Sequence, residues 1–96
     1  MGTVTSLLKL MQELKALDKE NTIYAATPWT TKSKAIVLRE PVSGEIPREA
    51  KDLGLSYFIE VYIACDFIEE WEKNFHIAAY AEEKCLRLIE YAINDA

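Results

Sequence analysis

The segment CDFIEEWEKNFH, residues 65–76, combines residue types that could do chemistry. Successive helical residues are rotated by about 100°, so four of its side chains would share an arc of about 60°. These four are Cys65, Glu69, Glu72 and His76. Glutamate and histidine on adjacent turns are possible ligands for a transition metal. The other side of the helix would carry Phe67, Ile68, Trp71 and Phe75, so the polar side is equally typical of the solvated face of an amphipathic helix.

The solvated face is the favoured interpretation, because one helix rarely supplies all the ligands of a metal site. The chain has a single histidine, His76, and contains no Glu-x-x-His motif. A catalytic Cys–His pair is also unfavourable, since Cys65 and His76 would lie about 16 Å apart along the helix axis. We therefore predict no metal, no cofactor and no catalytic residue, and we expect that the protein is not an enzyme. Glu69, Glu72 and His76 remain candidates for an interaction surface.

A second candidate site is the segment TPWTTKSK, residues 27–34. Trp29 lies between hydroxyl-bearing residues, with two lysines beyond it, so the segment could stack a ring and hold an anion. It contains no glycine and therefore cannot be a phosphate-binding loop of the P-loop kind. In the structural interpretation Trp29 folds back over a hairpin and covers the core, while the threonines occupy turn positions. Trp29 is kept as a candidate interaction residue because tryptophans often anchor interfaces.

The elements that must position these residues follow from hydrophobic periodicity and turn residues. Helices are expected at residues 5–18, at 47–53 with Gly54 ending the helix, from about 64 through the segment above, and at roughly 79–93. Strands are expected at 22–26 and 34–40, joined as a β-hairpin, and a loop at 40–47. The length fits one domain, residues 1–96.

The stretch LSYFIEVYI, residues 55–63, fits both a strand and a helix. Its β-branched and aromatic residues favour a central strand through about Tyr62, followed by a helix from about Ala64. The predicted fold class is therefore α+β: a short antiparallel sheet of two to three strands packed against about three to four helices.

Charge is distributed unevenly along the chain, whose net charge is −5. Residues 1–48 contain seven Lys/Arg and five Asp/Glu, whereas residues 49–96 contain four and eleven. The acidic half would repel phosphate groups, so we expect no direct binding of nucleic acid. It would attract a basic protein partner.

Apolar runs are far shorter than the ~20 residues needed to span a bilayer, so we expect no membrane partner. The N-terminus does not read as a signal peptide. Cys65 and Cys85 form no CxxC pair and are expected to be reduced and buried, which favours the cytoplasm. A chain of this size also leaves much apolar surface exposed, and a homodimer would cover part of it.

Three segments, TIYAATPW, LGLSYFIEVYIACDFIEEW and EKCLRLIEYAINDA, together resemble a group of small single-domain bacterial proteins of unknown function. The resemblance implies a bacterial cytoplasmic protein and supplies no activity or site residues. In size and charge the chain also looks like the immunity proteins and inhibitors that neutralise basic nucleases.

The function expected from these observations is a small acidic interaction protein, immunity-like or regulatory, that binds a basic protein partner. The alternative is a small-molecule or metal-binding protein that uses the Trp29 loop or the Glu69/Glu72/His76 face.

Overall fold

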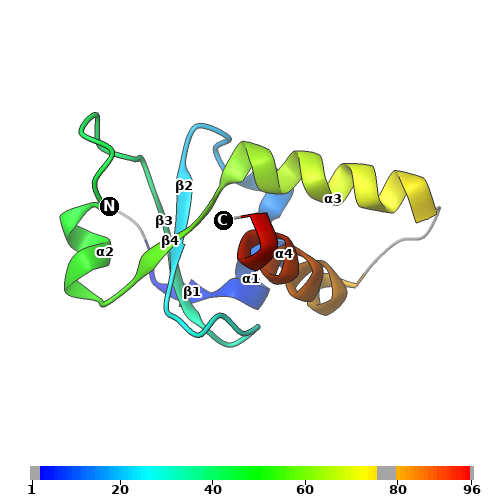
Figure 1. Ribbon diagram of the computed structural model, residues 1–96, viewed down its shortest axis with the longest axis horizontal. Coiled ribbons are helices and arrows are strands. Elements are labelled where there is room, and N and C mark those ends of the chain that lie inside the picture. Colours follow the sequence, from blue (N-terminus) through cyan, green and yellow to red (C-terminus); the bar gives the residue numbers. More distant parts are fainter. Residues whose placement is uncertain (1–2, 76–79, 96) are drawn as a thin grey trace.

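A four-stranded antiparallel sheet separates one short helix from a larger group of helices (Figure 1). The computed structural model describes residues 3–75 and 80–95. Its strands are β1 (Thr5–Ser6), β2 (Thr22–Ala25), β3 (Lys34–Leu38) and β4 (Ser56–Glu60), in the order β1-β3-β2-β4. Its helices are α1 (Leu7–Gln12), α2 (Arg48–Asp52), α3 (Val61–Phe75) and α4 (Ala81–Asp95), with a 3₁₀ helix, η1, at Leu14–Ala16. The α+β prediction is confirmed, although the sheet has one strand more than expected.

The additional strand, β1, comes from the start of the predicted helix 5–18. Thr5 and Ser6 pair with Ala35 and Lys34 of β3, so α1 begins only at Leu7. The Ser6 hydroxyl accepts a hydrogen bond from the Lys9 amide at 3.1 Å and caps the helix. The prediction placed the helix start two residues too early because a pairing with a distant strand leaves no periodic signal.

The central strand of the sheet is β2, which contradicts the prediction that residues 55–62 form the central strand. All four residues of β2 are buried, and the strand pairs with β3 on one edge and β4 on the other. Strand β4 lies at an edge of the sheet and ends at Glu60, so α3 begins at Val61, three residues earlier than expected. Val61 is fully buried and its amide donates to the Asn21 carbonyl.

A bulge in β4 changes which side chains share a face of the sheet. Ile23 pairs with Ile59, but Tyr24 pairs with Tyr57, so Phe58 is an extra residue in β4. Phe58 and Ile59 consequently both join the larger core. Strand residues three apart normally point to opposite faces, but the bulge turns Tyr57 and Glu60 to the face of Tyr24.

Two cores occupy the two faces of the sheet. The larger core, on the α1, α3 and α4 side, includes Leu7, Leu10, Ile23, Phe58 and Leu88. The smaller core, on the α2 side, consists of Tyr24, Ile36, Ala50 and Leu55. As predicted, Gly54 ends α2, with φ +73°, and the Leu55 amide reaches back to the Ala50 carbonyl. This turn brings Leu55 and Ala50 onto Tyr24 together.

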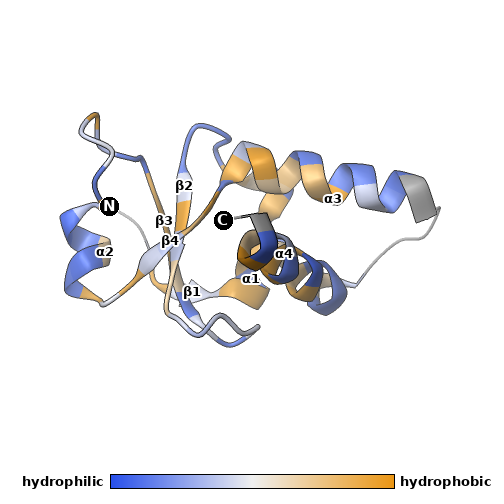
Figure 2. Ribbon diagram, viewed as in Figure 1, coloured by the Kyte–Doolittle hydropathy of each residue, from blue (hydrophilic) through white to orange (hydrophobic). Residues whose placement is uncertain are grey.

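Helices α3 and α4 form an antiparallel hairpin beyond the sheet (Figure 1). Three contacts join them in register. The Phe67 and Tyr91 rings lie 4.6 Å apart, the Arg87 guanidinium lies 5.7 Å from the centre of the Trp71 ring, and Glu72 bonds Lys84 at 3.3 Å. Figure 2 shows apolar residues concentrated in the first half of α3 and hydrophilic residues toward its end. Among the described residues, no helix is both long and apolar enough to cross a membrane.

Two leucines of α4 provide a matched test of this packing. Leu88 is fully buried, whereas Leu86 is 54% exposed. We expect Leu88→Ala to lower the free energy of unfolding by about 2–5 kcal/mol through lost burial and a residual cavity. Leu86→Ala should change it by less than about 0.5 kcal/mol. Urea denaturation of both variants measures the difference, and equal effects would contradict the assigned orientation of α4.

Candidate functional site

The outward side of α3 presents an acidic surface. Its exposed members are Tyr62, Asp66, Glu69, Glu70 and, in the last turn, the basic Lys73; we call the first four the acidic face of α3. Tyr62 is 48% exposed, although it belongs to a residue type that is usually partly buried. Among the described residues, no ion pair involves Asp66, Glu69 or Glu70. The three carboxylates therefore present negative charge to a partner without first breaking a described salt bridge.

The sequence-predicted face is rotated relative to the observed one. Cys65 was expected on the solvated side but is only 4% exposed, because Val61, Ala64, Cys65 and Ile68 together form the buried side of α3. The Cys65 thiol points at η1, where its sulfur lies 3.8 Å from the Leu14 carbonyl oxygen. Trp71, expected at the centre of the apolar stripe, lies at the margin and is half-buried.

Glu72 also lies at the margin of the buried side. Its carboxylate bonds the Lys84 ammonium, and both side chains are about four-fifths buried. This ion pair joins α3 to α4 and withdraws Glu72 from the acidic face. Glu69 remains exposed on that face. Of the three candidate interaction residues predicted on this helix, the described part of the chain includes Glu69 and Glu72. His76 lies outside the described residues.

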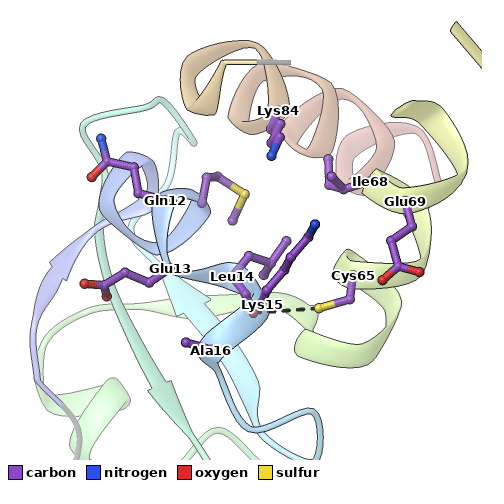
Figure 3. A pocket seen from close by; sticks show the side chains of 10 residues that line it. Gln12, Glu13, Leu14, Lys15, Ala16, Cys65, Ile68, Glu69 and Lys84 are labelled. Atoms are coloured by element: carbon purple, nitrogen blue, oxygen red, sulfur yellow. Dashed lines mark hydrogen bonds between the residues drawn. The ribbon is translucent and has the colours of Figure 1, made fainter. Parts of the chain in front are cut away.

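A cleft of about 280 Å³ opens between η1 and the two long helices (Figure 3). Met11, Leu14, Cys65 and Ile68 supply the less polar part of its lining. Glu13, Lys15, Glu69 and Lys84 supply charge, and Figure 3 shows the Lys15 ammonium extending toward Glu69 and Lys84. The cleft thus adjoins the acidic face of α3 at Glu69.

The two cysteines are poor candidates for nucleophiles. Both are free and buried, as predicted. Burial raises the pKa of the Cys65 thiol, and nearby Lys19 lowers it only in part. Burial, with a smaller contribution from Glu82, raises the pKa of Cys85 to about 11. Because the thiolate is the reactive form, both groups are deactivated rather than activated.

Trp29 has the covering role expected in the structural interpretation. Its indole nitrogen donates to the Ala25 carbonyl at 3.3 Å, and its ring meets Phe58 edge-on with centroids 4.9 Å apart. The hydroxyls around it hold the loop: Ser33 accepts from the Thr30 amide at 2.8 Å and donates to the Pro28 carbonyl. A hollow of about 200 Å³ remains beside Trp29, lined by Phe58, Ile63 and Tyr91 among others.

No cluster in the described part of the chain has the arrangement of a metal site. Within residues 3–75 and 80–95, no three His, Cys, Asp or Glu side chains are placed to hold one ion. The helical wheel placed Cys65 and Glu72 with Glu69, but the thiol turns into the core and Glu72 turns toward Lys84. Sequence reasoning missed Asp66, Glu70 and Tyr62, although their i, i+4 spacing was a readable signal.

Comparison with known proteins does not extend this description: no protein-family model matches the chain, nor does any curated protein or solved structure. The resemblance to small bacterial proteins therefore stays a prediction.

The raised pKa of Cys85 predicts a loss of stability at alkaline pH. An ordinary thiol has a pKa near 9, so the unfolded chain loses this proton before the folded one, whose pKa is about 11. The folded state then binds more protons than the unfolded state, and the free energy of unfolding falls as pH rises from about 9 to about 11. Tyr57, with its pKa raised to about 12, adds a loss of the same sign at higher pH.

Urea denaturation of the wild type and Cys85→Ala, measured at several pH values in this range, checks the prediction. The variant should lose stability less steeply between about pH 9 and 11. Identical slopes would show that Cys85 ionises normally in the folded protein.

Proposed function

We propose that this protein is a non-enzymatic interaction protein that binds a basic protein partner through the acidic face of α3. The observation that carries the proposal is the set of three exposed carboxylates, Asp66, Glu69 and Glu70, beside the exposed ring of Tyr62. Carboxylates attract lysine and arginine side chains, and tyrosine is enriched at interfaces because it adds contact area at low entropic cost.

The cleft next to Glu69 gives such a partner a place for one anchoring side chain. Apolar atoms of Met11, Leu14 and Ile68 would contact an apolar side chain of the partner, because the ammonium groups of Lys15 and Lys84 in the lining would repel a cationic one. The basic side chains of the partner are expected on the acidic face of α3, beside the cleft. This combination of a pocket with a charged rim is typical of interface hot spots. An immunity-like, inhibitory or regulatory role in the bacterial cytoplasm fits this chemistry, and the two free, buried thiols are compatible with a reducing compartment.

The alternative, small-molecule or metal binding, has weaker support. The Trp29 ring and indole nitrogen are already used in packing and hydrogen bonding. Glu72, which a metal site on α3 would need, is paired with Lys84.

Charge reversal tests the proposed face. The double variant Glu69→Lys/Glu70→Lys should lose partners that the wild type retains on affinity beads from a bacterial lysate, or slow their association at least tenfold at low salt, because steering depends on local charge. Retention by the wild type should weaken as salt increases, since exposed charges are screened beyond about 8–10 Å.

A matched control separates the local face from the change in net charge. Glu49→Lys/Asp52→Lys makes the same charge change on α2, where both side chains are exposed, on the opposite side of the sheet. This variant should retain the partner. Equal loss in both variants, or retention that is independent of salt, would contradict binding through the acidic face of α3.

Self-association is a second candidate, favoured by two exposed apolar residues of α4. Leu86 and Ile93 are 54% and 60% exposed, and their spacing of seven places them on one side of the helix. If two copies meet there, light scattering will give the mass of a dimer, and Leu86→Glu will return it to that of a monomer. A monomeric wild type at high concentration would exclude this interface.

A further inference from the structure

A small acidic pocket lies on the face of the sheet opposite to α3, beside β2 and β4. Its volume is about 350 Å³, at the lower end of the ~300–1,000 Å³ typical of ligand sites. Three glutamates, Glu40, Glu45 and Glu60, line it together with the rings of Tyr24 and Tyr57. Among the described residues, no lysine or arginine lines this pocket and no ion pair involves these glutamates.

Three features of the fold place these residues around the pocket. The bulge at Phe58 turns Tyr57 and Glu60 to the same face of β4. Glu40 follows β3 and continues the side of Ile36, which pairs with Tyr24. The turn at Gly44, with φ +80° and its amide bonded to the Pro41 carbonyl, brings the loop back to complete the rim.

The buried hydroxyl of Tyr24 is independent support for a ligand in this pocket. The side chain is 1% exposed, yet its hydroxyl makes no hydrogen bond of ordinary geometry with the described residues. Its pKa is raised by burial, then by the charges of Glu40 and Glu60, and is lowered only by the neighbouring Thr22 hydroxyl. Tyr24 also lines the same pocket as Glu40 and Glu60. A buried hydroxyl without a partner is destabilising, and a ligand that hydrogen-bonds to it would remove this cost.

Tyr57 also lines the pocket, and its contacts leave room for a ligand. Its hydroxyl donates to Glu60 at 3.4 Å, which uses one carboxylate oxygen. Burial raises the pKa of Tyr57 to about 12, and the charges of Glu60 and Glu40 add to the effect. Its ring is 44% exposed and meets the Tyr24 ring edge-on at 6.4 Å. Part of the Tyr57 side chain is thus accessible to a ligand.

From these contacts we infer that the pocket binds a guanidinium group, held by Glu40 and Glu60, stacked on Tyr57 and donating to the Tyr24 hydroxyl. Among the described residues the carboxylates are not placed to hold one metal ion, so a larger cationic group that contacts two of them fits the pocket better. A guanidinium offers five N–H donors in one plane and stacks on aromatic rings, whereas an ammonium offers three donors and no flat face. This site is independent of the acidic face of α3.

The test is a titration of the ¹⁵N-labelled protein with N-acetyl-arginine methylamide, followed by NMR. Shifts should saturate at the amides of Tyr24, Gly44, Tyr57 and Glu60. The neutral isostere N-acetyl-citrulline methylamide should bind at least tenfold more weakly, because it lacks the charge. A parallel titration with n-propylguanidinium distinguishes the two sources of the group: equal affinity means that a small free guanidine suffices, and weaker binding means that the peptide part contributes.

Two variants examine the contacts. Glu60→Gln should weaken binding about tenfold, as expected for loss of a charge-assisted hydrogen bond. Tyr24→Phe should weaken binding while leaving the urea midpoint unchanged or raised, because it removes a hydroxyl without a partner. Glu83→Gln and Tyr80→Phe, which make the same changes at exposed residues outside both proposed sites, should leave binding unchanged.

Equal binding of the citrulline compound, shifts confined to α3, or no saturable shift with any probe would each overturn the inference. So would a Tyr24→Phe variant that is destabilised and binds normally, since the hydroxyl would then serve only the fold. None of these results bears on the charge-reversal test at Glu69 and Glu70, so the two proposals fail separately.

Discussion

The burial of β2 on both of its faces is the constraint on which the rest of the fold depends. Ile23 and Ala25 face the larger core, while Tyr24 faces the smaller one. A strand hydrogen-bonded on both edges and covered on both faces requires apolar material on each side. Residues 48–55, which include α2, therefore have to cover Tyr24, even though α2 has only five residues. The larger group of helices covers the other face.

Local sequence signals predicted most of the elements but not their pairing. The hairpin of β2 and β3, the short helix ending at Gly54 and the final helix all follow from turn residues and periodicity. The position of β1 and the bulge at Phe58 depend on partners distant in the sequence. A single extra residue reverses the alternation of side chains, so the shared face of Tyr57 and Glu60 was not predictable from period-two reasoning.

The candidate face on α3 was predicted in part, for a related reason. A helical wheel identifies the angular spread of polar side chains, but the direction of burial depends on which neighbours the helix meets. Cys65 is buried where it contacts η1, and Glu72 lies at the margin of the buried side because it pairs with Lys84 of α4. Asp66, Glu69 and Glu70 stay exposed, although Glu69 borders the cleft next to η1 and Lys84. The acidic character of α3 was therefore readable, whereas the particular carboxylates that remain available were not.

The second half of α3 and the acidic pocket beside Tyr24 both carry carboxylates, but the effect on the stability of the fold differs between them. Beyond the sheet, α3 is held chiefly by α4, through a tilted pair of aromatic rings, an ion pair and a cation–π contact, so its outward carboxylates are not required for packing. Around Tyr24, by contrast, carboxylates gather near a buried hydroxyl that lacks a partner. A buried hydroxyl without a partner raises the energy of the folded state, and a bound donor would remove that cost. In proteins whose local and global preferences otherwise agree, such a conflict tends to mark a functional site. The surface of α3 can be acidic at little cost to the fold, whereas the acidity around Tyr24 is more simply explained by a ligand.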